Sequence, residues 1–200
     1  MSTALEQAEL REEHVQADNR TLFGFWTYIM TDCILFASLF ATYAVLHTNI
    51  FGGPSGKDIF DAPYALAETL ILLTSSFTCG LAMLATKKRD KSQVLWWLLV
   101  TFVLGAAFLV LELNEFHHFV QDGNSWRRSG FLSAFFTLVG THGLHITVGL
   151  MWIVGMIVKI SQKGFSRATL RRLTMLSYFW HFLDAVWIFI FTVVYMLGVN

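Results

Sequence analysis

The sequence has 200 residues, of which 55% are hydrophobic and 14% are charged, and it contains only two prolines. Its mean hydropathy of +0.55 is typical of an integral membrane protein and not of a water-soluble domain. Because a helix needs about 20 mostly apolar residues to cross a bilayer, the chain can hold several spans with short connections. This length excludes a sizeable soluble domain beside them.

Hydrophobic runs between polar breaks predict five membrane-spanning helices. The runs cover residues 23–46, 64–86, 94–116, 131–158 and 173–198. A water-soluble bundle of this size would carry a polar stripe along every helix, and these runs do not. We therefore predict an all-α integral membrane bundle of five transmembrane helices within residues 23–200, preceded by an acidic cytoplasmic tail, residues 1–22.

Basic residues are divided unequally between the segments that join the spans. Eleven Lys and Arg residues lie in the N-terminal tail and in the second and fourth connections, and three lie in the remaining connections. Since cytoplasmic loops carry the excess of Lys and Arg, the N-terminus is predicted to be cytoplasmic. With five spans, the C-terminus is then predicted to be periplasmic.

Two features of the connections and spans bear on helix packing. The basic turn at residues 87–91 is so short that spans two and three are predicted to be antiparallel neighbours. Small residues allow helices in membranes to approach closely. Span four carries four of them, which indicates that helices or lipid lie close against it: Gly140, Gly143, Gly149 and Gly155.

Ionisable residues interrupt the apolar runs. They are Asp32, Glu68, Glu112, Glu115, His142, His145, His181 and Asp184. A charged side chain at the centre of a bilayer helix costs roughly 2.5–3.5 kcal/mol even on insertion scales, so such residues are normally kept where they face protein and have partners. We predict that they point inward, and that any function of the chain lies among them.

Five of these residues are interpreted as an internal polar network: Asp32, His142, His145, His181 and Asp184. Within it, neutral imidazoles would donate hydrogen bonds to carboxylates or backbone carbonyls. A bound metal and a path for protons or ions stay open as alternatives, because three histidines and an aspartate resemble a metal site. Binding of two stacked haems would need histidines separated by most of a span on each of two helices. The paired histidines of this sequence are too close together for that.

Glu68, Glu112 and Glu115 map toward the exported half of their spans and are predicted to form a second, outer acidic cluster. Arg127 or Arg128 in the following loop is the candidate counter-charge. The alternative is that these carboxylates cap helices and pair with loop residues.

Two motifs resemble the signature of subunit III of haem–copper oxidases. They are Phe131-Leu132-Ser133-Ala134-Phe135-Phe136 with Gly140-Thr141-His142-Gly143-Leu144-His145, and Trp180-His181-Phe182-Leu183-Asp184-Ala185-Val186-Trp187. The similarity covers residues 23–198, and the segment GGPSGKDIF at residues 52–60 is similar to the bacterial quinol-oxidising branch. The family's intramembrane acid, a glutamate, falls here on Asp32.

The resemblance implies a non-catalytic subunit of a proton-pumping terminal quinol oxidase in the bacterial inner membrane. Haems and copper would belong to catalytic subunit I and the other subunits, which are the expected partners. Phospholipid is expected to bind the chain. The resemblance implies no catalytic residue in this chain and no binding of metal or nucleic acid to it. Three rival functions remain: subunit III of a cytochrome c oxidase, a stand-alone haem or metal oxidoreductase, and a small transporter.

Overall fold

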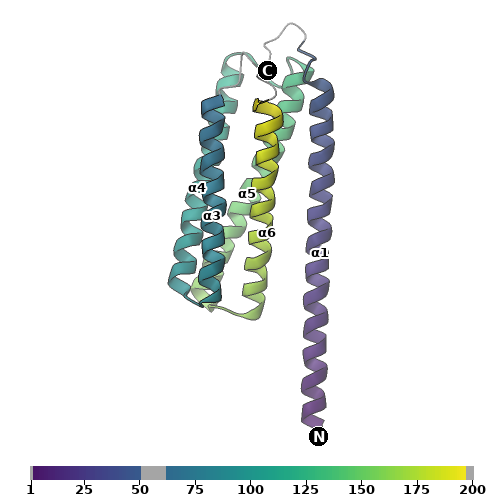
Figure 1. The fold of residues 1–200 in the computed structure, drawn as a ribbon, viewed down its shortest axis with the longest axis vertical. Coiled ribbons are helices and arrows are strands. Elements are labelled where there is room, and N and C mark those ends of the chain that lie inside the picture. Colours follow the sequence, from purple (N-terminus) through teal and green to yellow (C-terminus); the bar gives the residue numbers. More distant parts are fainter. Residues whose placement is uncertain (1, 51–61, 197–200) are drawn as a thin grey trace. The chain divides into compact units, whose positions relative to one another are not determined.

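The structure is a computed structural model that describes residues 2–50 and 62–196, with side chains described at residues 19–50 and 63–196. Its elements are α1 (Ser2–Leu46), α3 (Ala62–Lys87), α4 (Lys91–Gln121), α5 (Gly130–Lys163), α6 (Arg167–Ile190) and the π-helix η1 (Phe191–Met196) (Figure 1). No strand occurs in these two ranges, so the prediction of an all-α fold is confirmed. Residues 52–60 and 197–198, which the sequence analysis also used, lie outside the described residues.

Among the described residues, five helices are long and apolar enough to cross a membrane, as predicted. They are Asn19–Leu46, Pro63–Lys87, Lys91–Gln121, Gly130–Lys163 and Arg167–Met196. Several extend beyond the apolar runs, because helical hydrogen bonding continues into the polar residues that flank a span. The largest difference is at the start of the chain, where α1 already begins at Ser2 and the acidic segment is helical.

Short polar turns bring consecutive helices back on one another. Asp90, Ser129 and Ser166 accept hydrogen bonds of 3.1–3.2 Å from backbone N–H groups in the first turns of α4, α5 and α6. Such N-caps satisfy donors that a helix start otherwise leaves unpaired. Gly164, with φ of 65°, ends α5 in the left-handed region that suits glycine.

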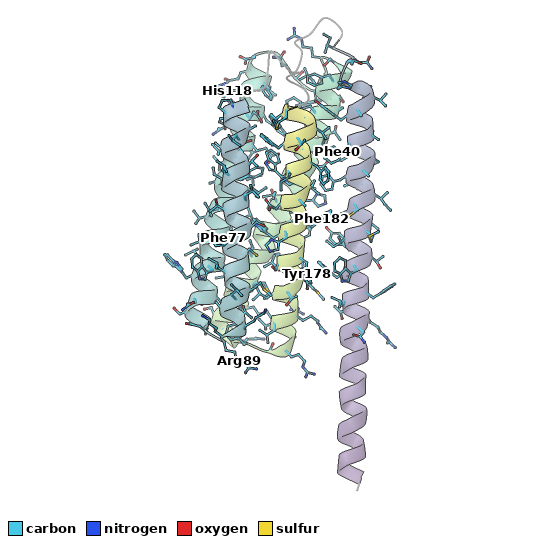
Figure 2. The ribbon with its side chains drawn as sticks, viewed as in Figure 1. Phe40, Phe77, Arg89, His118, Tyr178 and Phe182 are labelled. Atoms are coloured by element: carbon cyan, nitrogen blue, oxygen red, sulfur yellow. The ribbon has the colours of Figure 1, made fainter. Side chains whose placement is uncertain are left out.

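Helices α3, α4, α5 and α6 form a closed four-helix arrangement. Each packs on the next along the chain, and α6 returns to pack on α3, so the predicted pairing of the second and third spans is confirmed (Figure 1). The turns α3–α4 and α5–α6 meet at one end of this bundle, and η1 lies at the other. Arg89 marks the first end and His118 of α4 the second (Figure 2).

A tryptophan of α6 explains two glycines of the neighbouring helices. A Cβ atom at Gly105 of α4 would lie 2.8 Å from the ring of Trp180, and one at Gly149 of α5 would lie 2.9 Å from it. The Trp180 side chain is 1% exposed, and its Nε1 donates to Ser75 Oγ at 3.1 Å. The small residues therefore let a large aromatic side chain fill the centre of the bundle.

The chain divides into two units, Met1–Ser38 and Leu39–Asn200. The last turns of α1 belong to the second unit. There the ring of Phe40 lies 6.4 Å from that of Phe189, and the ring of Tyr43 lies 6.2 Å from that of Phe131. The second unit therefore contains the four-helix bundle together with the C-terminal end of α1.

Candidate functional site: buried carboxyl and histidine groups

Three glutamates from two helices lie together inside the bundle. Glu68 of α3 is 0% exposed, and Glu112 and Glu115 of α4 are 1% and 7% exposed. Every pair among these three carboxyl groups interacts electrostatically. Glu68 lies six residues after the start of α3 and Glu115 six before the end of α4, each about 9 Å along its helix. The structure thus brings the three residues of the outer acidic cluster to one level.

Helix α5 and the π-helix η1, which directly follows α6, complete the surroundings of this cluster. The Tyr195 hydroxyl of η1 donates a hydrogen bond to Glu115 Oε2 at 2.7 Å. From α5, Gly143 provides room for Glu112, since a Cβ atom there would lie 2.8 Å from Glu112 Oε1. Four elements, α3, α4, α5 and η1, therefore contribute to a cluster that the sequence assigned to the second and third spans.

Glu68 and Glu112 differ from Glu115 in their partners. Neither oxygen of either carboxyl group has a hydrogen-bond partner among the described residues. Arg127 and Arg128, the candidate counter-charges, have contacts in their own loop: Arg127 lies 5.9 Å from the centre of the Trp126 ring, and Arg128 donates to Asn124 Oδ1 at 2.6 Å. Neither arginine is hydrogen-bonded to Glu68 or Glu112.

His142 sits in an aromatic stack next to the carboxyl cluster. Its imidazole is 0% exposed and stacks on Trp187 with ring centres 5.3 Å apart, while Phe108 meets it edge-on at 5.9 Å. Trp187 Nε1 donates to Thr69 Oγ1 at 3.0 Å, and Thr69 is the neighbour of Glu68 in α3. The stack and the cluster therefore share the same level of the bundle.

His145 makes a local contact. Its Nδ1 donates to the carbonyl oxygen of Thr141 one turn earlier at 2.8 Å, and its imidazole interacts electrostatically with that of His142. The spacing that the sequence analysis noted does place the two imidazoles close together along α5.

His181 and Asp184 form a separate group with Ser76 of α3. Ser76 Oγ lies 2.7 Å from His181 Nδ1 and is also hydrogen-bonded to Asp184. A serine hydroxyl can donate to the carboxylate and accept from the imidazole N–H at the same time. The second carboxyl oxygen, Asp184 Oδ1, has no hydrogen-bond partner among the described residues. This group links α3 to α6.

Asp32 belongs to the first unit of the chain. There it is hydrogen-bonded to the side chain of Tyr28, one helical turn earlier. Of the five residues of the predicted polar network, the structure thus shows two close pairs, His142 with His145 and His181 with Asp184. A single network that joins all five stays a prediction.

Three residues of these sites had no predicted site role: Ser76, Tyr195 and Trp187, of which Trp187 was noted only as part of the second motif. Each lies in an apolar span and, read alone, looks like a residue of the helix core or surface. Tyr195 carried no signal, whereas Gly143 was noted only for close helix packing. Within the described side chains, no three His, Cys, Asp or Glu residues are grouped as ligands of a metal ion would be.

The fold and these sites define a multi-pass helical membrane protein whose polar side chains are enclosed by its own helices. The chain belongs to the family described as cytochrome c oxidase subunit III, whose family model matches residues 3–199. The resemblance found in the two motifs is therefore confirmed.

Bacterial relatives agree with this assignment. The chain is 53% identical over 99% of both chains to the cytochrome bo(3) ubiquinol oxidase subunit 3 of Pseudomonas aeruginosa. It is 57% identical to the protein of the same name from Pseudomonas putida, covering 90% of this chain and 86% of that one. A cytochrome c oxidase subunit 3 from Bacillus sp. strain PS3 is 42% identical over 94% and 90% of the two chains. The protein is a multi-pass protein of the bacterial inner membrane.

Proposed function

We propose that the chain is the third subunit of a terminal ubiquinol oxidase, a membrane complex that reduces oxygen to water and pumps protons. The observation that carries the proposal is the 53% identity over 99% of both chains to a ubiquinol oxidase subunit 3. The chain would have no catalytic centre, and it would support assembly and stability of the complex. Subunit I and the other subunits would hold the haems and copper, while phospholipid would bind along the spans.

The surroundings of the histidines support a role without haem in this chain. An axial haem ligand needs a ring nitrogen that faces the porphyrin. His142 is enclosed between Trp187 and Phe108. His181 is close to Ser76 and Asp184. We infer that His145 and His181, together with Asp32, serve as hydrogen-bonding groups between or along helices, and that His142 packs within its aromatic stack.

We also propose that the N-terminus is cytoplasmic and the C-terminus periplasmic. Residues 1–22 would then form an acidic cytoplasmic segment and residues 23–200 the transmembrane domain. The support is the eleven-to-three division of basic residues, since the basic turns that precede α4 and α6 lie at one end of the bundle (Figures 1 and 2).

Ubiquinol and cytochrome c as electron donors can be separated by one experiment. The tagged chain is purified from membranes in mild detergent, and oxygen uptake is recorded with a short-chain ubiquinol and with reduced cytochrome c. We expect uptake with ubiquinol only. Uptake with cytochrome c only would identify the complex as a cytochrome c oxidase, the function that the relative from Bacillus sp. strain PS3 has in its name.

The same preparation tests whether the chain itself holds a redox centre. A reduced-minus-oxidised spectrum is recorded before and after the chain is separated from its partners. Haem and oxygen uptake should stay with the partner subunits. Haem or metal that stays with the isolated chain would make the histidines ligands and would overturn the proposal.

A further inference from the structure

The cluster of Glu68, Glu112 and Glu115 contains buried carboxyl groups without hydrogen-bond partners in the described part of the chain. A role in assembly and stability of the complex does not require such groups. Glu68 and Glu112 are at least 99% buried, and neither has a hydrogen-bond partner among the described residues. Transfer of an unpaired carboxylate out of water is so costly that such groups are normally found neutral or paired. These two side chains therefore have the surroundings of a carboxylic acid and not of a carboxylate.

The arrangement of the three carboxyl groups relative to one another gives the same result. Glu68 comes from α3 and interacts electrostatically with both glutamates of α4. Like charges that interact in a medium of low dielectric constant disfavour one another's ionisation. Only Glu115 has a described donor, the Tyr195 hydroxyl at 2.7 Å, so this carboxyl group is the one that can best hold a negative charge.

We propose that Glu68, Glu112 and Glu115 form one proton-binding site, in which Glu68 and Glu112 are neutral acids and Glu115 carries the single negative charge. A proton that enters the site binds a carboxylate oxygen of Glu115 and makes the cluster neutral. When this proton leaves, the charge returns to Glu115 beside Tyr195. The ligand of the site is thus a proton, and no metal is needed.

The other titratable groups around the site are few. From α3, Tyr64 interacts electrostatically with Glu68 and Glu115, and its hydroxyl donates to the carbonyl of Leu111 at 3.0 Å. From α5, His142 adjoins Gly143 and is enclosed in its aromatic stack. From η1, Tyr195 is bonded to Glu115. The exchangeable charge is therefore assigned to the carboxyl groups.

The position of the carboxyl cluster along the helices determines from which side of the membrane protons reach it. Glu115 lies about 9 Å from the end of α4 that carries His118, but 24 residues, about 36 Å, from the end next to Arg89 (Figure 2). Tyr64, which is half-buried, stands one turn closer than Glu68 to the start of α3. Exchange therefore occurs with the aqueous phase away from the basic turns. This inference does not depend on the electron donor of the complex.

Infrared difference spectroscopy of the intact purified complex tests the proposal. Spectra are recorded in H₂O and D₂O at acid and at alkaline pH. Acid-minus-alkaline differences give the band of the group that titrates, and wild-type-minus-variant differences at one pH give the carbonyl bands of carboxylic acids that stay protonated. Glu68→Gln and Glu112→Gln should each remove one such band, which in the wild type shifts in D₂O. Glu115→Gln should abolish the pH-dependent band. Asp122→Asn, a change at an exposed residue that follows α4, is the control and should leave all of these bands unchanged.

Alternative outcomes are separated in the same spectra. If a glutamine variant does not assemble, Glu68→Asp or Glu112→Asp keeps the acid and should move its band. Unchanged acid bands in all of these variants would overturn the proposal. Carboxylate bands that respond to Na⁺, K⁺ or Ca²⁺ would also overturn it, because they would show a cation site in place of a proton site.

Discussion

The distance between α4 and α5 at the carboxyl cluster depends on the absence of one side chain. Gly143 faces Glu112, and a Cβ atom there would lie 2.8 Å from one carboxyl oxygen and 3.0 Å from the other. Real Cβ atoms do not come so close, so Glu112 or the helix would have to move. Because Glu112 is 1% exposed and surrounded by packed side chains, it has little room to do so.

We therefore expect Gly143→Ala to destabilise the protein by about 1–3 kcal/mol, the usual cost of overpacking. Gly155→Ala in the same helix is the control, because nothing lies within 4 Å of its Cβ position. This second change should be neutral or should stabilise α5 by up to about 1 kcal/mol. The purified complex is heated, and the loss of this subunit from it is recorded against temperature to compare the stability of the two variants. Equal stability of the two variants would contradict the close contact.

The hydroxyl group of Tyr195 donates a hydrogen bond to the carboxyl group of Glu115. Tyr195→Phe removes a 2.7 Å hydrogen bond between two buried groups and leaves a carboxyl oxygen without this donor, which costs about 1–3 kcal/mol. Tyr64→Phe removes a bond to a backbone carbonyl at a half-buried position and should cost less. Denaturation of the complex in increasing denaturant compares the two. A larger loss for Tyr64→Phe would mean that Tyr195 is not an important partner of Glu115.

At the scale of the elements, η1 explains why Tyr195 reaches the cluster. A π-helical turn holds more residues than an α-helical turn and changes which side chains face inward. In η1 both Val194 and Tyr195 are 0% exposed, and the segment packs on α3. The sequence Phe-Thr-Val-Val-Tyr-Met gives no sign of this, since packing and not local preference selects a π-helix.

The N-cap of α4 lies in one of the two basic turns and depends on a single residue. Asp90 is an acidic residue in a basic turn, and its carboxylate caps α4 through two backbone N–H groups. Asp90→Ala should destabilise the protein by about 1 kcal/mol, whereas Asp90→Ser should keep most of the stability, because serine also caps helices well. Thermal unfolding of the two variants checks this. An alanine variant as stable as the serine variant would show that the cap contributes nothing here.

The sequence predicted helices and their neighbours more fully than it predicted sites. Apolar runs located five spans, and the short turn at residues 87–91 paired α3 with α4. By contrast, the predicted network did not specify the neighbours of its histidines: His142 stacks on Trp187 of α6, and His181 lies beside Ser76 of α3. Spacing within one helix shows which residues share a face. It does not show which residue of another helix faces them, because that depends on packing angles that a single sequence does not specify.

At the scale of the whole molecule, charge and burial give the bundle two different ends. One end has the basic turns, in which Lys91 Nζ donates to the carbonyl of Ser161 at 2.8 Å and so ties α4 to α5. The buried carboxyl groups lie toward the other end. A membrane protein inserted with its basic loops in the cytoplasm would expose the carboxyl end of this bundle to the periplasm.

This orientation can be measured by labelling single cysteines in intact cells. The native cysteines are first replaced by Cys33→Ser and Cys79→Ala, and Lys88→Cys or Arg127→Cys is then added, both at exposed positions outside the apolar runs. A maleimide that cannot cross the inner membrane should label the Arg127→Cys variant in cells with a permeabilised outer membrane, and the Lys88→Cys variant only after lysis. The opposite pattern would invert the chain and place the proton-binding carboxyl groups on the cytoplasmic side. Their protons would then come from the compartment from which the complex takes up protons, and not from the one into which it releases them.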